Sequence, residues 1–131
     1  FDKKNFFLID WREDFGGNLD YGDLYYDLAK MYGGIEMNYD IIKKGKFSYL
    51  EKKNRIFYKY DSRKVIMNEI KQEYEEFISL KKLSLEKIEI LKCLIYINMS
   101  PLHEYPFDKL LFAHGKYQLF QTLKKYEYIS K

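Results

Sequence analysis

Apolar residues recur at helical spacing in three successive stretches of the second half of the chain, and this pattern limits the fold more than any other feature. Asp61 or Ser62 can cap the first helix, and Ser84 can cap the second, with Glu86 placed favourably in its first turn. The first helix has an apolar stripe of Ile66, Ile70, Tyr74 and Phe77. The pattern therefore predicts a helical subdomain over residues 61–131.

The second of these helices is apolar on most sides, which predicts a central position among the other helices. Its apolar residues are Ile88, Leu91, Leu94, Ile95 and Ile97. Pro101 ends this pattern, and Pro106 suits the first turn of a last helix. That last helix is expected to bury one side, made of Phe107, Leu110, Leu111, Tyr117, Phe120 and Leu123.

Residues 1–22 are typical of a strand that runs into a loop. The short apolar run from Phe6 to Ile9 ends at Asp10, and it predicts a buried strand. Gly16 and Gly17 then indicate a long loop, because closely spaced glycines favour turns over regular structure.

Residues 23–60 are expected to combine helices with one β-hairpin. A helix is predicted from Asp23, and the glycine pair 33–34 should end it. A second short helix is predicted over residues 36–44. Residues 47–50 and 55–60 flank a turn-like segment, which indicates a hairpin. The fold class that follows is mainly α with a small β component.

The composition suits a cytoplasmic globular protein. Hydrophobic residues are 47% and aromatic residues 19% of the 131 residues, which is ample for a core. The formal net charge is only +3 and the signs are mixed, which argues against nucleic-acid binding. The single cysteine, Cys93, cannot form an internal disulfide and fits a reducing compartment. The apolar run 87–99 is too short and too charged to span a membrane.

Asp10 is the residue best placed for chemistry. A carboxylate where a buried strand gives way to a loop can hold Mg²⁺, because the strand fixes the side chain and the loop leaves room for metal and phosphates. The same position also suits an aspartate that only ends a strand. The triplet Asp14-Phe15-Gly16 spells the protein-kinase magnesium motif, but that motif needs its Asp directly after a strand. We therefore interpret the triplet as a turn.

The order of residues from Phe6 to Tyr32 resembles a known family. The run Ile9-Asp10, a glycine-bearing loop, and then Gly22-Asp23-x-x-x-Asp27-Leu28-Ala29-Lys30 resemble the C-terminal lobe of aminoglycoside and choline kinase-like phosphotransferases. The likeness is closest to the branch associated with capsule and surface-polysaccharide biosynthesis. It also includes Asn98-Met99-x-Pro101-Leu102-His103-x-Tyr105-Pro106-Phe107. The resemblance implies the helical C-lobe of a protein-kinase-like fold with its N-lobe absent.

The resemblance assigns roles to three aspartates. Asp10 would bind the Mg²⁺ that bridges the phosphates of ATP. Asp23 and Asp27 would be structural, with Asp27 near a helix start, where it can accept backbone N–H bonds that brace the active-site loops. The parent protein would transfer the γ-phosphoryl group of ATP to a hydroxyl of a small molecule, an amino alcohol or a sugar.

In that family the catalytic base and the nucleotide-binding lobe precede the strand that holds the metal aspartate. This sequence has no such residues before Phe6, so we expect residues 1–131 to be a single partial domain that alone neither binds ATP tightly nor transfers phosphate. An uncovered apolar face should favour self-association. The alternative is a non-catalytic helical module that binds a partner or a fused enzyme domain, such as a nucleotidyltransferase. An intact catalytic loop upstream would favour the enzyme.

Four further residues are candidates for a substrate pocket. Trp11 and Arg12 directly follow Asp10 and could face substrate or phosphate, although a packing role suits Trp11 equally well. His103 and Tyr105 lie between two predicted helices, where His103 could line the pocket or serve only in a turn. His103 and His114 are the only histidines, and their spacing matches no metal-ligand motif.

Overall fold

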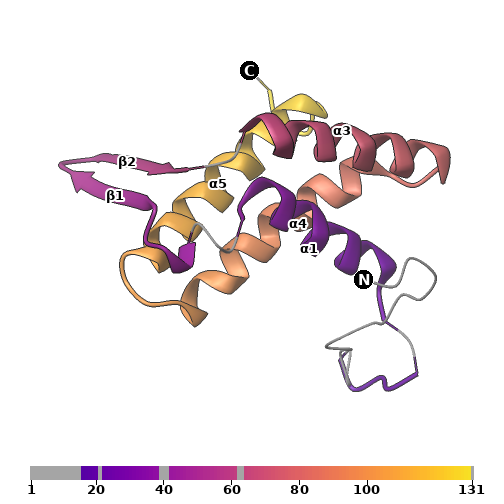
Figure 1. Cartoon of the computed structure of the whole chain (residues 1–131), viewed down its shortest axis with the longest axis horizontal. Coiled ribbons are helices and arrows are strands. Elements are labelled where there is room, and N and C mark those ends of the chain that lie inside the picture. The colour runs from indigo at the N-terminus through magenta and orange to yellow at the C-terminus, as the bar shows by residue number, and fades with distance from the viewer. Residues whose placement is uncertain (1–15, 21, 39–41, 62–63, 131) are drawn as a thin grey trace.

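A computed structural model describes residues 16–20, 22–38, 42–61 and 64–130 of the chain (Figure 1). Within these ranges the elements are α1 (Leu24–Glu36), β1 (Phe47–Lys52), β2 (Arg55–Tyr60), α3 (Lys64–Leu80), α4 (Leu85–Met99), the 3-10 helix η1 (Ser100–Leu102) and α5 (Phe107–Lys125). The fold is mainly helical with one two-stranded antiparallel sheet, as the sequence predicts. The strand predicted at residues 6–9 lies outside the described ranges. Over the described ranges, no helix is long and apolar enough to cross a membrane.

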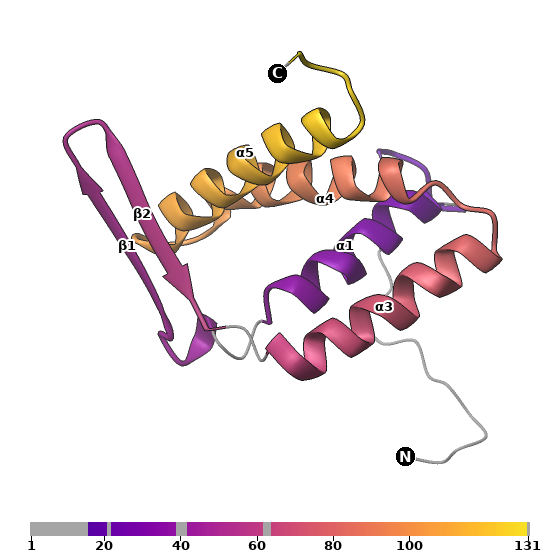
Figure 2. The same ribbon diagram turned by 90° about the horizontal axis from the view of Figure 1, so that it is seen from above.

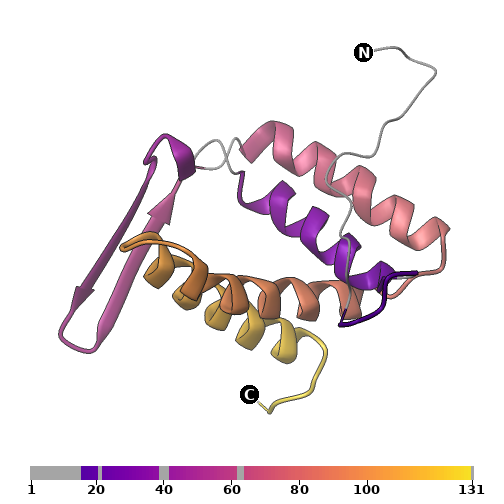
Figure 3. The ribbon, with the colours of Figure 1, turned by 90° about the horizontal axis from the view of Figure 1, so that it is seen from below.

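The helices lie side by side in the order α3, α1, α4, α5, and the hairpin packs at one end of them (Figures 2 and 3). One core cluster joins α1, α3 and α4, and it contains Leu28, Ala29, Tyr32, Tyr74, Ile78 and Ile88. A second joins the end of α1 with α4 and α5, and the hairpin covers it. Its buried members are Met37, Tyr96, Phe107, Leu110 and Leu111.

Helix α4 is central, as its apolar character predicts. It packs against both α1 and α5, with Ile88 and Cys93 fully buried. The predicted cap is also confirmed, because Ser84 Oγ accepts the backbone N–H of Lys87 at 3.2 Å. Leu94 is exposed, so the apolar surface of α4 extends somewhat beyond what its neighbours cover.

Helix α1 does not end at the glycine pair, contrary to the prediction. It continues through Gly33 and Gly34 to Glu36, and Met37 is its C-cap. The reason is tertiary: Gly33 lies under α4, where an added Cβ would be 3.3 Å from Tyr96 Oη. The glycine therefore permits close helix packing instead of ending the helix. The short helix predicted over residues 36–44 falls partly outside the described ranges, and its predicted start is wrong.

The predicted stripe of α3 is only partly correct. Tyr74 is buried as expected, and Ile78 is buried beside it, but Ile66, Ile70 and Phe77 are exposed. Helical spacing shows that one side of a helix is apolar, but burial also requires a neighbour along that side. In the described part of the chain, the main neighbour of α3 is α1.

The predicted stripe of α5 is correct only in its first half. Phe107, Leu110 and Leu111 are buried, whereas Tyr117 and Phe120 are exposed. The buried side continues instead through His114, Gly115 and Thr122. Gly115 allows α5 to cross α4 closely, because an added Cβ would lie 2.8 Å from Ile97 Cγ1 and 3.1 Å from the Cys93 carbonyl oxygen.

The hairpin is confirmed, with its first strand two residues longer than predicted. β1 and β2 pair from Phe47 with Tyr60 to Lys52 with Arg55, which leaves a two-residue turn. Lys53 in that turn has a φ of +54°. The face bearing Phe47, Tyr49, Tyr58 and Tyr60 packs on the second core cluster.

Candidate functional site

The predicted metal ligand, Asp10, and its neighbours Trp11 and Arg12 lie outside the described residues. The first described residues, Gly16 and Gly17, form a turn with φ of +62° and +87°. A left-handed backbone of this kind favours glycine. Gly16 of the Asp14-Phe15-Gly16 triplet thus lies in a turn, and Asp14 and Phe15 lie outside the described residues.

Asp23 and Asp27 occupy different environments at the start of α1. Asp23 is the N-cap, and its Oδ1 accepts the backbone N–H of Tyr25 at 2.8 Å. Asp27 lies in the first turn with an exposed side chain, where its charge favours the helix N-terminus. The helix-capping bond thus comes from Asp23.

Two tyrosine hydroxyls fix α1 to its neighbours through its backbone. Tyr74 of α3 donates to the Leu28 carbonyl at 2.8 Å, and Tyr96 of α4 donates to the Gly33 carbonyl at 2.7 Å. The Tyr32 ring also stacks on Tyr74, with centroids 5.0 Å apart. These contacts hold the helix at its second and its last turns, so the segment that follows the predicted metal loop has a defined position.

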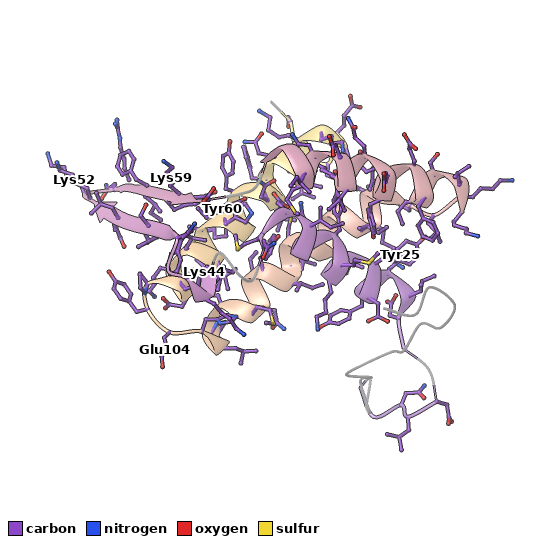
Figure 4. The ribbon with its side chains drawn as sticks, in the orientation of Figure 1. Tyr25, Lys44, Lys52, Lys59, Tyr60 and Glu104 are labelled. Carbon is purple, nitrogen blue, oxygen red and sulfur yellow. The ribbon has the colours of Figure 1, made fainter. Side chains whose placement is uncertain are left out.

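His103 and Tyr105 lie far from Asp23 and Asp27. Ser84 at the start of α4 contacts Tyr25, whereas Tyr96 near its end contacts Gly33, so α1 and α4 run parallel. The 15 residues of α4, about 22 Å of helix, therefore separate the start of α1 from the loop after η1. Figure 4 shows this separation in the positions of Tyr25 and Glu104.

The two residues of that loop differ in exposure. The His103 ring is partly buried and meets the Phe107 ring edge-on, with centroids 5.0 Å apart. The Phe107 ring in turn meets the Phe47 ring of the hairpin, with centroids 5.2 Å apart. Tyr105 is 74% exposed. His103 thus helps to pack the base of the hairpin, and Tyr105 is accessible to solvent.

A buried polar cluster, formed by Glu36, Lys92 and His114, joins α1, α4 and α5. Lys92 Nζ donates to Glu36 Oε2 at 2.5 Å, and the Lys92 side chain is only 7% exposed. His114 Nε2 lies 3.6 Å from Glu36 Oε1, which is longer than a hydrogen bond. Glu36 is therefore bound more closely to Lys92 than to His114. His114 Nε2 has no hydrogen-bond partner among the described residues.

The electrostatics of the cluster keep Glu36 ionised. Burial by itself raises the pKa of Glu36, but contact with His114 and the positive charge of Lys92 outweigh it and lower the pKa to about 2. The Lys92 ammonium also lies 5.0 Å from the centroid of the Tyr32 ring. The buried lysine thus has both a carboxylate and an aromatic face as partners.

Three tyrosines surround His114 and connect the cluster to the hairpin. The rings of Tyr58, Tyr60 and Tyr96 meet the imidazole edge-on, with centroids 5.7, 5.4 and 5.1 Å away. Tyr58 Oη lies 3.3 Å from His114 Nδ1. Burial, with the Glu36 charge as a smaller cause, raises the pKa of Tyr60 and Tyr96, so both keep their protons. Tyr60 is labelled at the base of the hairpin in Figure 4.

Sequence reasoning missed this cluster. Lys92 interrupts the apolar run of α4, and His114 falls at the helical spacing that continues from Leu110 and Leu111, so both positions carried a signal of burial. Nothing in the sequence indicates that Glu36 is their partner. In the described ranges, no three His, Cys, Asp or Glu side chains are grouped so that they could hold a metal ion.

Comparisons with protein-family models, with curated proteins and with solved structures gave no match for this chain.

Proposed function

We propose that this chain is the C-terminal part of an ATP- and Mg²⁺-dependent phosphotransferase that acts on a hydroxyl of a small molecule, an amino alcohol or a sugar, in surface-polysaccharide biosynthesis. Asp10 is the metal ligand in this proposal. The catalytic base and the nucleotide-binding lobe are assigned to residues N-terminal to Phe1, and the helices of this chain border the acceptor.

The ordered motif supports the proposal, together with the helix that its second half forms. Asp10 precedes a glycine-bearing loop, and the loop leads into the Gly22 to Lys30 segment. Asp23 caps α1, and Leu28 and Ala29 of the same motif are buried. Phosphoryl transfer depends mainly on positioning, so a loop that ends on a fixed helix suits a metal-binding carboxylate.

An ATP and Mg²⁺ binding titration tests the proposal on the longer protein that includes the upstream lobe. We expect metal-dependent binding that is lost in Asp10→Ala, retained in Asp14→Ala, and absent from the 131-residue chain alone. Asp14→Ala is the matched control, because it removes a carboxylate from the neighbouring triplet. Phosphoryl transfer by Asp10→Ala should fall by orders of magnitude. Binding that survives Asp10→Ala but not Asp14→Ala would overturn the assignment.

A non-catalytic role in binding a partner or a fused domain is the second candidate, and exposed apolar side chains favour it. They lie on several elements: Leu50, Phe57, Ile66, Ile70, Phe77, Phe112 and Phe120. Such a surface is typical of a protein that another domain or chain covers. The isolated chain should therefore self-associate in analytical ultracentrifugation, and a monomer at all concentrations would count against this role.

A further inference from the structure

A cleft of about 380 Å³ lies between strand β2 and helix α5. Its lining is largely apolar, and it consists of Ile56, Tyr58, Phe112, Ala113, Lys116 and Tyr117. Sites for small molecules commonly enclose about 300 to 1,000 Å³, so the cleft can hold a compact ligand. None of the lining residues belongs to the motif that carries the proposed phosphotransferase activity.

One wall of the cleft is fixed from behind by the buried cluster. Tyr58 Oη lies 3.3 Å from Nδ1 of His114, whose side chain is 2% exposed. His114 faces Glu36, and Glu36 binds Lys92. The position of the Tyr58 ring is therefore set by contacts with α1, α4 and α5 together, and this wall is formed before any ligand binds.

The lining residues define the chemistry of the ligand. Three aromatic rings, from Tyr58, Phe112 and Tyr117, favour a flat ring over a branched apolar group. Lys116 is the single charged residue of the lining, and its Nζ lies 5.4 Å from the centroid of the Phe112 ring. The cation therefore lies next to an aromatic ring that lines the cleft.

The charged residues of the hairpin divide between its two faces. Glu51, which pairs across the hairpin with Ile56, is on the face that borders the cleft, and its Oε2 accepts a hydrogen bond from Tyr49 at 3.3 Å. Lys52 and Lys59, which are labelled in Figure 4, are on the opposite face, because neighbouring residues of a strand alternate between faces. Lys116 is therefore the cation that an anionic group in the cleft contacts.

We propose that this cleft binds a small, flat aromatic molecule that carries a carboxylate or a phosphate. The ring of the ligand lies against Phe112 and Tyr117, opposite Tyr58, and its anionic group contacts Lys116. Apolar and aromatic contacts supply most of the affinity, and the lysine selects anions over cations.

Helix α5 contains its own control for this proposal. Phe112 and Lys116 are followed eight residues later by Phe120 and Lys124, and Lys124 Nζ lies 5.6 Å from the Phe120 ring centroid. Both pairs have the same spacing and the same cation–π contact, and both rings are about half exposed. Only the first pair lines the cleft.

Backbone-amide NMR on the 131-residue chain, titrated with naphthoate, tests the proposal. We expect saturable shifts confined to β2 and the middle of α5, and weaker binding of naphthylmethylammonium, which has the same ring and the opposite charge. Lys116→Gln should weaken naphthoate binding about two- to fivefold. Phe112→Ser should weaken it about tenfold, and Phe112→Leu, which keeps an apolar side chain, should weaken it less. Phe120→Ser and Lys124→Gln should leave it unchanged.

Three results would overturn the proposal. The first is equal binding of the ammonium and the carboxylate. The second is equal loss of binding in the two matched pairs of variants, which would indicate nonspecific contact with exposed rings. The third is the absence of naphthoate shifts at millimolar ligand, together with binding of a pentapeptide that has phenylalanine at its centre and two glutamates on each side. That result would assign the cleft to a protein partner.

Discussion

Helices α5 and α3 lie at opposite ends of the row of helices and pack in different ways, α5 mainly on α4 and α3 mainly on α1. α5 buries a continuous side that includes small and polar residues, namely Phe107, Leu110, Leu111, His114, Gly115 and Thr122. α3 buries Tyr74 and Ile78, and leaves Ile66, Ile70 and Phe77 exposed. The contrast teaches that an apolar stripe is buried only where a neighbour covers it, and that the residues in closest contact need not be apolar.

The largest expected effect concerns two of the isoleucines of α3. Ile78 is 1% exposed and Ile70 is 39% exposed. Ile78→Ala should lower the free energy of unfolding by about 3 to 4 kcal/mol, because it leaves a cavity in the first core cluster. Ile70→Ala removes the same atoms from a partly solvated site and should cost less than about 1 kcal/mol. Urea unfolding followed by circular dichroism measures both. Equal costs would mean that another part of the protein covers the outer side of α3.

The next effect concerns pH and the cluster that joins α1, α4 and α5. The pKa of Glu36 is lowered from its ordinary 4.5 to about 2, so its ionised form stabilises the folded state. This contribution is complete above about pH 5 and is lost as the pH falls toward 2. A pKa difference of this size between the unfolded and folded states corresponds to about 3 kcal/mol of unfolding free energy.

Unfolding measured between pH 6 and pH 2, values that bracket this titration, tests the cluster. Glu36→Gln should destabilise the protein at neutral pH, because it leaves Lys92 buried without a carboxylate. It should also flatten the loss of stability on acidification. Glu76→Gln, at an exposed position of α3, is the matched control and should change neither. An unchanged acid profile in Glu36→Gln would show that other carboxylates govern it.

A smaller effect separates two glycines that the sequence does not distinguish. Gly115→Ala should destabilise the protein by about 1 to 3 kcal/mol, since the new Cβ meets Ile97 and the backbone of α4. Gly34→Ala meets no atom within 4 Å and should stabilise α1 by about 0.5 to 1 kcal/mol. Thermal unfolding of the two variants should therefore shift in opposite directions. A destabilising Gly34→Ala would contradict the continuous helix through this residue.

The successes and failures of the sequence predictions have one physical cause. Ser84, the hairpin residues and the apolar run of α4 carry local signals, and the structure confirms the elements that they predict. The sequence pattern predicts a helix end at Gly33, and this prediction is wrong because the role of Gly33 depends on Tyr96, which lies 63 residues away in the chain. Tyr117 and Phe120 have helical spacing but no covering neighbour among the described elements.

In the candidate site, too, local signals can be read from the sequence and contacts between distant residues cannot. The cap at Asp23 follows from the residue type and the pattern after it. The partners of Lys92 and His114 come from different helices, so no spacing within one segment could reveal the cluster. The role of Asp10 stays a prediction that rests on the motif.

The smallest expected effect tests whether Asp23 is structural, as the resemblance implies. Asp23→Ala removes the acceptor of the Tyr25 N–H bond and should cost about 1 kcal/mol of stability, whereas Asp23→Asn keeps a capping oxygen and should cost only a few tenths. Urea unfolding measures both, and Ser84→Ala gives a second cap of the same kind for comparison. Asn differs from Asp mainly in charge, so the same Asp23→Asn substitution in the longer protein separates two roles. If Asp23 only caps α1, Asp23→Asn should leave the rate of phosphoryl transfer nearly unchanged. A large loss of rate in a stable Asp23→Asn variant would mean that the carboxylate charge itself serves the reaction, and that the start of α1 belongs to the active site.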